Sequence, residues 1–189
     1  MITQIDFYIL NSIQGMRCGF LDVVMPVITY LGSGGAIWLL ASALLLFSKK
    51  SRKTGIALLL SLLIGLIIST VLLKGIVARE RPFNINGAEL DVNSILIGAP
   101  SGRFSFPSGH SVSSFSAASV LLSYNRKIGI PALILAVLIA FSRLYLYVHF
   151  PTDVLAGAVL GIIFASASIF IVNKIEEKIN ERKLSDNSE

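Results

Sequence analysis

Residues 54–73 read TGIALLLSLLIGLIISTVLL, a run of twenty residues that contains no charged side chain. About 20 apolar residues are enough for a helix to cross the hydrocarbon core of a bilayer. The chain has four more uncharged stretches, which are Val23–Ser48, Phe104–Asn125, Ile128–Ser142 and Val154–Asn173. A buried soluble core accounts for one such stretch but not for five in 189 residues, so the sequence predicts a polytopic membrane protein.

The composition agrees with that prediction. Charged residues make up 14% of the chain, compared with about 25% in an average soluble domain. We therefore expect an all-α transmembrane helical bundle of five to six spans. The sixth span depends on whether the glycine-rich sequence at 32–35 divides the stretch Val23–Ser48 into a half-helix and a full helix. The single cysteine, Cys18, cannot form an internal disulfide.

The chain has room for one domain. We divide it into an interfacial helix over residues 1–17, a helical bundle over residues 20–173 and a cytoplasmic tail over residues 174–189. Isoleucines near the N-terminus recur at three- and four-residue spacing, at Ile2, Ile5, Ile9 and Ile13. This spacing predicts an amphipathic helix at the membrane surface. It is equally compatible with a helix that packs against the bundle.

The basic residues lie between the apolar stretches rather than in one stripe. Lysines and arginines fill the connections at 49–53 and 126–127 and the tail from 174 onward, and such connections are typically cytoplasmic. The segment 78–106 and the turn at 149–151 then share the extracytoplasmic face. The net charge of +5 therefore reflects topology, and we expect no nucleic-acid partner. The predicted localisation is the cell membrane, with multiple passes.

Two cations follow the apolar stretch 54–73 at its outer end. Lys74 and Arg81 are seven residues apart, close to two helical turns, so both side chains should point the same way. Pro82 disfavours helix at Arg81 and should mark the end of the helix. Charges at this depth usually face a cavity or a partner, although they also occur as snorkelling anchors. Arg79 points away from Lys74 in this geometry, and we interpret Arg79 and Glu80 as an interfacial ion pair.

The sequence Pro107-Ser108-Gly109-His110 opens an apolar helix rich in serine and alanine. Proline suits the first helical turn, and glycine lets a ligand approach the backbone. Free N–H groups at a helix N-terminus bind anions, and the Ser108 hydroxyl adds a donor. His110 lies on the first turn beside this predicted anion site. Taken alone, such a histidine or such a Ser-Gly pair is more often structural.

A third group comprises Ser142-Arg143, His149 and Asp153. The planar guanidinium of Arg143 matches the geometry of phosphate oxygens. Pro151 lies between His149 and Asp153, which predicts that His149 precedes a helix and that Asp153 occupies its first turn. The Asp153 carboxylate can then accept a proton from one imidazole nitrogen and leave the other nitrogen unprotonated and aimed outward.

Together the three groups place both histidines of the chain and three cations on one membrane face. The two histidines and Asp153 are enough for three metal ligands. However, the three neighbouring cations repel a divalent metal ion and attract an anion. The sequence therefore predicts a phosphate site that needs no metal.

These residues resemble the three-part signature of the type-2 phosphatidic acid phosphatase superfamily. That signature is Lys, six residues, Arg-Pro; then Pro-Ser-Gly-His; then Ser-Arg, five residues, His, three residues, Asp. Every position and spacing is present in the same order, as Lys74 to Arg81-Pro82, Pro107-Ser108-Gly109-His110, and Ser142-Arg143 to His149 to Asp153.

The resemblance implies an integral-membrane, metal-independent lipid phosphatase whose site faces the outer leaflet. It implies that His149 is the nucleophile and forms a phosphohistidine, that Asp153 fixes the tautomer of His149, and that His110 is the general acid. No metal and no cofactor are implied, and the partners are a lipid phosphate substrate and membrane lipids. The non-bridging phosphate oxygens are then held by Lys74, Arg81, Ser108, the Gly109 backbone and Arg143.

The signature recognises phosphate rather than the lipid tail. The small size and short loops resemble bacterial enzymes that act on undecaprenyl pyrophosphate, which we favour. Phosphatidylglycerol phosphate, phosphatidate and lipid A are alternative substrates. Two other classes are a non-catalytic membrane protein that binds a lipid or an anion, and a transporter. The intact signature argues against the first, and a transporter should carry ionisable residues near the bilayer midplane rather than at one face.

Overall fold

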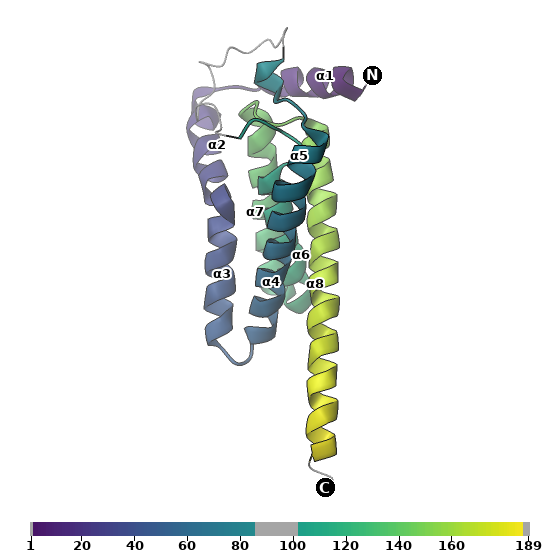
Figure 1. Cartoon of the computed structure of the whole chain (residues 1–189). Helices are drawn as coiled ribbons and strands as arrows, with labels where there is room; N and C mark the ends of the chain where they lie inside the picture. The colour runs from purple at the N-terminus through teal and green to yellow at the C-terminus, as the bar shows by residue number, and fades with distance from the viewer. Residues whose placement is uncertain (1, 86–101, 187–189) are drawn as a thin grey trace.

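A computed structural model of the chain describes residues 2–85 and 102–186. Its long helices run side by side, and α1 (Ile2–Gln14) lies across one end of the bundle (Figure 1). The other α-helices are α2 (Gly19–Leu31), α3 (Ala36–Phe47), α4 (Arg52–Gly65), α5 (Lys74–Val77), α6 (Gly109–Tyr124), α7 (Arg126–Tyr145) and α8 (Pro151–Asp186). Between them lie the 3-10 turns η1 (Ser33–Gly35) and η3 (Pro82–Asn84) and the π-helix η2 (Leu66–Leu73). The predicted all-α membrane bundle is confirmed.

Three helical units are long and apolar enough to cross a membrane, and they cover Arg52–Val77, Arg126–Tyr145 and Pro151–Asp186. A fourth is the pair formed by α2 and the segment Ser33–Phe47, which is bent by 40°. The bend falls at the predicted glycine break, where Gly34 and Gly35 have φ of 60° and 69°. Helix α6, with 16 residues, packs between α7 and α8. The break is therefore confirmed, and the exact number of spans stays a prediction.

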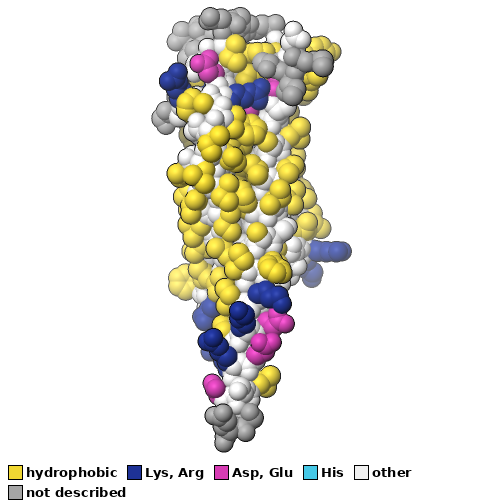
Figure 2. All heavy atoms as spheres, turned by 45° about the vertical axis from the view of Figure 1, so that its right-hand side comes forward, with side chains coloured by type: hydrophobic (Ala, Val, Ile, Leu, Met, Phe, Trp, Pro, Cys, Tyr) yellow, Lys and Arg dark blue, Asp and Glu magenta, His cyan; other side chains and the backbone are white. Residues whose placement is uncertain are grey.

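The outer surface of the bundle is apolar over its middle part. Figure 2 shows hydrophobic side chains covering the middle of the visible face, with Lys, Arg, Asp and Glu side chains gathered beyond it toward the two ends. Exposed side chains such as Leu44, Val71 and Phe170 are large and hydrophobic. A helix surface of this kind is stable against lipid, because only apolar side chains can face the hydrocarbon core without loss of hydration.

Two clusters of buried side chains hold the helices together. The larger cluster fills the bundle and includes Trp38, Leu58, Val120 and Ile139, and the Trp38 indole N–H donates to Ser114 Oγ at 3.0 Å. The second cluster lies at the end crossed by α1. It joins Leu10 of α1 to the buried turn between α7 and α8. Helix α1 is thus packed on the bundle as well as lying across its end.

Two glycines of α8 allow α6 to approach closely. A Cβ atom at Gly157 would lie 2.8 Å from the Ser108 carbonyl oxygen, and one at Gly161 would lie 2.6 Å from the Val112 carbonyl oxygen. Small residues four apart permit this kind of contact between membrane helices. The contact sets the first turns of α6 and α8 side by side, and the Ser108 N–H donates to the Asp153 carbonyl at 3.1 Å.

The charged region after residue 173 is a continuation of α8. The helix runs without interruption to Asp186, and residues 187–189 of the predicted tail lie outside the described residues. In Figure 1 this part of α8 projects beyond the rest of the bundle, at the end opposite to α1.

Candidate active site

His149 lies in the buried turn between α7 and α8, and Asp153 lies in the first turn of α8, as predicted. The His149 Nδ1 atom is 3.6 Å from Asp153 Oδ2. The same carboxylate oxygen accepts the Phe150 N–H at 2.9 Å, which fixes the rotamer of Asp153. The carboxylate can therefore hold the Nδ1–H tautomer of His149, because catalytic hydrogen bonds are often long in a free enzyme and shorten when substrate binds.

Arg81 faces the other ring nitrogen of His149. Its Nε donates to the Gly102 carbonyl at 2.7 Å, and its NH1 donates to the Val148 carbonyl at 2.8 Å. The same NH1 lies 3.4 Å from His149 Nε2. An anion that reaches His149 Nε2 therefore also reaches the Arg81 guanidinium.

The helical argument that linked Lys74 to Arg81 is wrong in its geometry. Helix α5 ends at Val77, because Ala78 adopts a left-handed conformation with φ of 48°. Arg81 is extended, with ψ of 154°, before Pro82. The two cations nevertheless converge, since Lys74 interacts electrostatically with both Arg81 and Arg143. The chain brings them together through the turn that follows α5 rather than along one helix face.

Arg143 is buried between α7 and α2. Its NH1 donates to the Thr29 hydroxyl at 2.5 Å, while its Nε is buried without a hydrogen-bond partner among the described residues. Thr29 was not predicted, because a threonine in an apolar helix carries no signal of its own. The unsatisfied Nε–H is available to an oxygen of a bound phosphate.

The predicted start of α6 is confirmed. Ser108 is the N-cap, and its Oγ accepts the Ser111 N–H at 3.4 Å and the Ser111 hydroxyl at 3.0 Å. A serine hydroxyl that accepts two bonds still has its own proton to donate. His110 follows on the first turn, and its ring packs against Gly32, where a Cβ atom would lie 3.0 Å from His110 Cδ2. Gly32 therefore makes room for the ring, a role not predicted from its place at the helix break.

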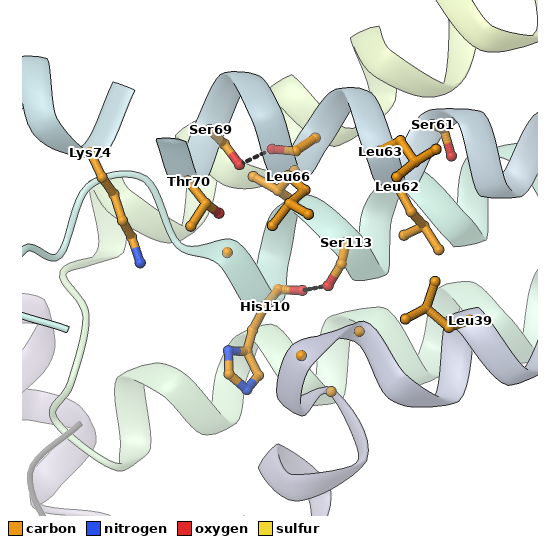
Figure 3. Close-up of a pocket in the computed structure, with 16 residues that line it drawn as sticks. Leu39, Ser61, Leu62, Leu63, Leu66, Ser69, Thr70, Lys74, His110 and Ser113 are labelled. Atoms are coloured by element: carbon orange, nitrogen blue, oxygen red, sulfur yellow. Dashed lines mark hydrogen bonds between the residues drawn. The ribbon is translucent and has the colours of Figure 1, made fainter. Parts of the chain in front are cut away.

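A cavity of about 310 Å³ extends from the polar site along the bundle. Figure 3 shows Lys74 and His110 at one end of it, with Leu39 and Leu62 toward the other. Leu39, Leu63 and Leu66 line the cavity and are also exposed on the apolar outer surface. The cavity thus joins a cationic end to a wall that faces lipid.

Arg79 does not pair with Glu80, and that prediction is wrong. Its NH1 lies 2.8 Å from Asp153 Oδ1, and its NH2 lies 2.7 Å from Asp6 Oδ2. Glu80 instead forms an isolated backbone bridge with Phe104. Because the turn after Val77 redirects the chain, Arg79 points into the protein rather than along the interface. No motif around Asp6 or Arg79 indicates that these residues belong to the site.

The electrostatic surroundings favour a neutral His149 and a bound anion. Burial, reinforced by the nearby arginines and Lys74, holds the pKa of His149 well below its ordinary value of 6.5. The imidazole is therefore unprotonated at neutral pH. Within residues 2–85 and 102–186, no three His, Cys, Asp or Glu side chains are grouped as metal ligands would be. The three cations around His149 suit the oxygens of a phosphate.

Known proteins share both the sequence and the architecture. Residues 54–177 match the PAP2 superfamily model. An undecaprenyl-diphosphatase of Sulfolobus acidocaldarius is 36% identical over 150 residues, which are 76% of this chain and 69% of that protein. A lipid A 4'-phosphatase of Bacteroides thetaiotaomicron is 29% identical over 94% of this chain and 81% of its own length. The crystal structure of a PAP2-type phosphatidylglycerolphosphate phosphatase from Bacillus subtilis superimposes with a TM-score of 0.68 and 30% identity, covering 94% of this chain and 87% of that one.

Proposed function

We propose that this chain, which belongs to the PAP2 superfamily and is an integral-membrane lipid phosphatase, acts through a phosphohistidine formed on His149. The observation that carries the proposal is the environment of this side chain. Its Nε2 lies 3.4 Å from a cationic nitrogen of Arg81, and its Nδ1 faces the buried carboxylate of Asp153. An imidazole oriented in this way presents a neutral nitrogen to an anionic phosphorus centre.

The first step forms a bond between His149 Nε2 and phosphorus while the bond from phosphorus to the departing oxygen breaks. His110, in its protonated form, donates a proton to that oxygen. In the second step the neutral His110 accepts a proton from water, and the resulting hydroxide attacks phosphorus. The bond to Nε2 breaks, inorganic phosphate leaves and His149 regains its lone pair. In support of these roles, the cavity places His110 with Lys74 at its cationic end, where the departing oxygen of a bound phosphate would lie (Figure 3).

Five groups besides the histidines are suited to hold the non-bridging oxygens. Lys74, Arg81 and Arg143 supply positive charge, and the Ser108 hydroxyl and the Gly109 backbone N–H supply neutral donors. Such groups accelerate phosphoryl transfer because they are oriented before charge moves onto the oxygens. Arg143 contributes through its unpartnered Nε–H.

The cavity supports a substrate with a long apolar tail. Phosphate bound between Lys74 and His110 leaves the tail to run past Leu62 and Leu66 toward the lipid-facing wall. Among the lipids considered, we favour undecaprenyl pyrophosphate, because the Sulfolobus relative carries that activity in its name. Phosphatidylglycerol phosphate and lipid A are the alternatives suggested by the other two relatives, and phosphatidate remains a fourth candidate.

We infer that the site lies at the extracytoplasmic face of the cell membrane. The support is the distribution of charge, since the basic connections at 49–53 and 126–127 lie at the end of the bundle opposite to the turn between α7 and α8 (Figure 1). Cytoplasmic connections are enriched in lysine and arginine. A substrate is then dephosphorylated in the outer leaflet.

A phosphate-release assay on purified lipids tests both parts of the proposal. The protein in detergent is given undecaprenyl pyrophosphate, phosphatidylglycerol phosphate, phosphatidate and lipid A, with the His149→Ala variant as the matched control. We expect the highest kcat/KM on undecaprenyl pyrophosphate and no release by the variant. A higher kcat/KM on another lipid overturns the substrate assignment, and turnover by the variant overturns the nucleophile. Binding of the lipids without any release by the wild type would instead support a non-catalytic binder.

A further inference from the structure

Asp6 on α1 is a buried carboxylate whose partners all belong to the active-site end of the bundle. It is 1% exposed. Its Oδ1 accepts the Thr152 N–H at 3.0 Å, and its Oδ2 accepts the Thr152 hydroxyl at 2.6 Å. Thr152 lies in the first turn of α8, where backbone N–H groups have no partner within the helix. Asp6 therefore caps α8 from another helix.

The second partner of Asp6 is Arg79, which links it to Asp153. One nitrogen of the guanidinium, NH2, donates to Asp6 at 2.7 Å, and the other, NH1, donates to Asp153 at 2.8 Å. NH1 also donates to the Thr152 hydroxyl at 2.6 Å. A planar guanidinium is suited to joining two carboxylates in fixed positions. Arg79 thereby gives the buried carboxylate of Asp153 a direct ion pair, in addition to its longer-range interactions with Lys74 and Arg81.

Aromatic rings hold the same guanidinium from another side. The Arg79 guanidinium carbon lies 4.0 Å from the centre of the Phe150 ring, a distance typical of a cation–π contact. The Phe150 ring meets Phe7 of α1 edge to face, with centroids 5.2 Å apart. Asp6 and Phe7, adjacent on α1, thus both contribute to the position of Arg79.

We propose that Asp6 is a positioning residue of the catalytic site, and that α1 completes the site through the chain Asp6–Arg79–Asp153. Asp153 Oδ1 is held by Arg79, while Oδ2 is held by the Phe150 N–H and faces His149 Nδ1. Without Asp6, the Arg79 guanidinium loses one of the two carboxylates that fix its plane, so it holds Asp153 Oδ1 less firmly. The inference rests on the proposed roles of His149 and Asp153.

The test compares two variants that each remove one polar contact between α1 and the rest of the bundle. Asp6→Asn keeps the shape of the side chain, but its amide N–H₂ is a donor that faces the donors of Thr152 and Arg79. Asn11→Ala removes the acceptor of the Tyr147 hydroxyl, 2.9 Å away, which also joins α1 to the turn between α7 and α8. Among the described residues, Asn11 forms no hydrogen bond with Arg79 or Asp153. Both variants are compared with the wild type in detergent, on the panel lipid that gives the highest wild-type kcat/KM.

We expect Asp6→Asn to lower kcat by about tenfold or more with KM within about twofold, since displacing a catalytic group by about 1 Å can cost about 10²-fold in rate. Asp6→Glu, which keeps the charge, should recover part of this loss. Asn11→Ala should stay within about twofold of the wild type, and all variants should elute as monodisperse protein. If Asp6 acts through Arg79, adding Asp6→Asn to Arg79→Ala should cost no more than Arg79→Ala alone.

The inference is overturned if kcat falls no further in Asp6→Asn than in Asn11→Ala, or if the change in Asp6→Asn is in KM rather than in kcat. It is also overturned if kcat is lower in Asp6→Glu than in Asp6→Asn, or if the fold-losses in kcat of Asp6→Asn and Arg79→Ala multiply in the double variant. The His149→Ala variant separates this failure from that of the proposed mechanism. If His149→Ala is inactive while Asp6→Asn is normal, the positioning role alone is wrong. If His149→Ala still turns over, the mechanism on which the role depends is wrong.

Discussion

Replacing Gly157 by alanine should displace the start of α6, which carries Ser108 and His110, without changing any residue of the site. The added Cβ atom would lie 2.8 Å from the Ser108 carbonyl oxygen and 2.9 Å from Ser111 Cβ, whereas ordinary contacts begin at 3.4 Å. Both neighbours belong to the start of α6, which cannot move aside as a flexible side chain does. Restoring ordinary contact requires α6 and α8 to separate there by about 0.6 Å, the difference between these distances.

That separation has two measurable consequences. The Ser108 N–H to Asp153 carbonyl bond, now 3.1 Å, lengthens beyond the usual range of about 2.7–3.2 Å. Overpacking costs about 1–3 kcal/mol of stability, and alanine in a helix recovers about 0.5–1 kcal/mol relative to glycine. The net loss is therefore about 0–2.5 kcal/mol, centred on about 1 kcal/mol. Because a displacement of about 1 Å can cost 10²-fold in rate, we expect kcat to fall by about tenfold.

The assay combines thermal unfolding in detergent with phosphate release from the preferred lipid. Gly19→Ala is the matched control, because a Cβ atom there has no neighbour within 4 Å. We expect Gly157→Ala to unfold at a lower temperature and to turn over more slowly, while Gly19→Ala matches the wild type. A Gly157→Ala protein with wild-type stability and wild-type kcat would refute the claim that this close approach sets the position of Ser108 and His110.

Four further predictions follow from the site. His149→Ala should abolish turnover and any covalent phosphoenzyme, and phosphate trapped on this variant would contradict the roles. His110→Ala should lower kcat about 10²–10⁴-fold on monophosphate lipids and less on pyrophosphate lipids, whose leaving group is better. The pKa of His149 lies well below 6.5, so the neutral nucleophile is lost only as pH falls through that lowered value. The acidic limb of kcat/KM against pH should therefore lie below pH 6.5, and half-maximal activity on that limb at or above pH 6.5 would contradict the lowered pKa. Phosphate release should survive EDTA and be inhibited by vanadate, and a loss in chelator that magnesium restores would show that a metal is needed. In a Cys18→Ser background, an impermeant thiol reagent added to intact cells should label a cysteine at Asn84 and not one at Lys50, and the reverse labelling would invert the topology.

The parts of the fold and site that could be predicted depend on local sequence. The spans follow from uncharged runs long enough to cross a bilayer, and the glycine-rich break in the first span follows from the conformational freedom of glycine. The start of α8 follows from Pro151, since proline suits the first turn of a helix, whereas Pro107 precedes the N-cap of α6 and does not occupy its first turn. These local features were sufficient to place His110 on the first turn of α6 and Asp153 on the first turn of α8.

The parts that could not be predicted depend on contacts between distant segments. Asp6 and Thr29 acquire their roles from partners more than seventy residues away, and neither has a neighbouring motif that indicates it. The Arg79 prediction failed because the helical period was extended past Val77, where Ala78 adopts a left-handed conformation that its residue type does not suggest. By contrast, Gly157 and Gly161 did offer a signal, because small residues four apart are typical of close helix contacts in membranes.

The uninterrupted helix α8 is longer than the hydrocarbon core of a bilayer is thick. Thirty residues separate Asp153 from Lys183 within this helix, which corresponds to about 45 Å at 1.5 Å per residue. The hydrocarbon core is only about 30 Å thick. With the site at the extracytoplasmic face, as proposed, a probe or an affinity tag attached near Lys183 lies on the cytoplasmic side, where it can report on orientation and neighbours without contacting the site.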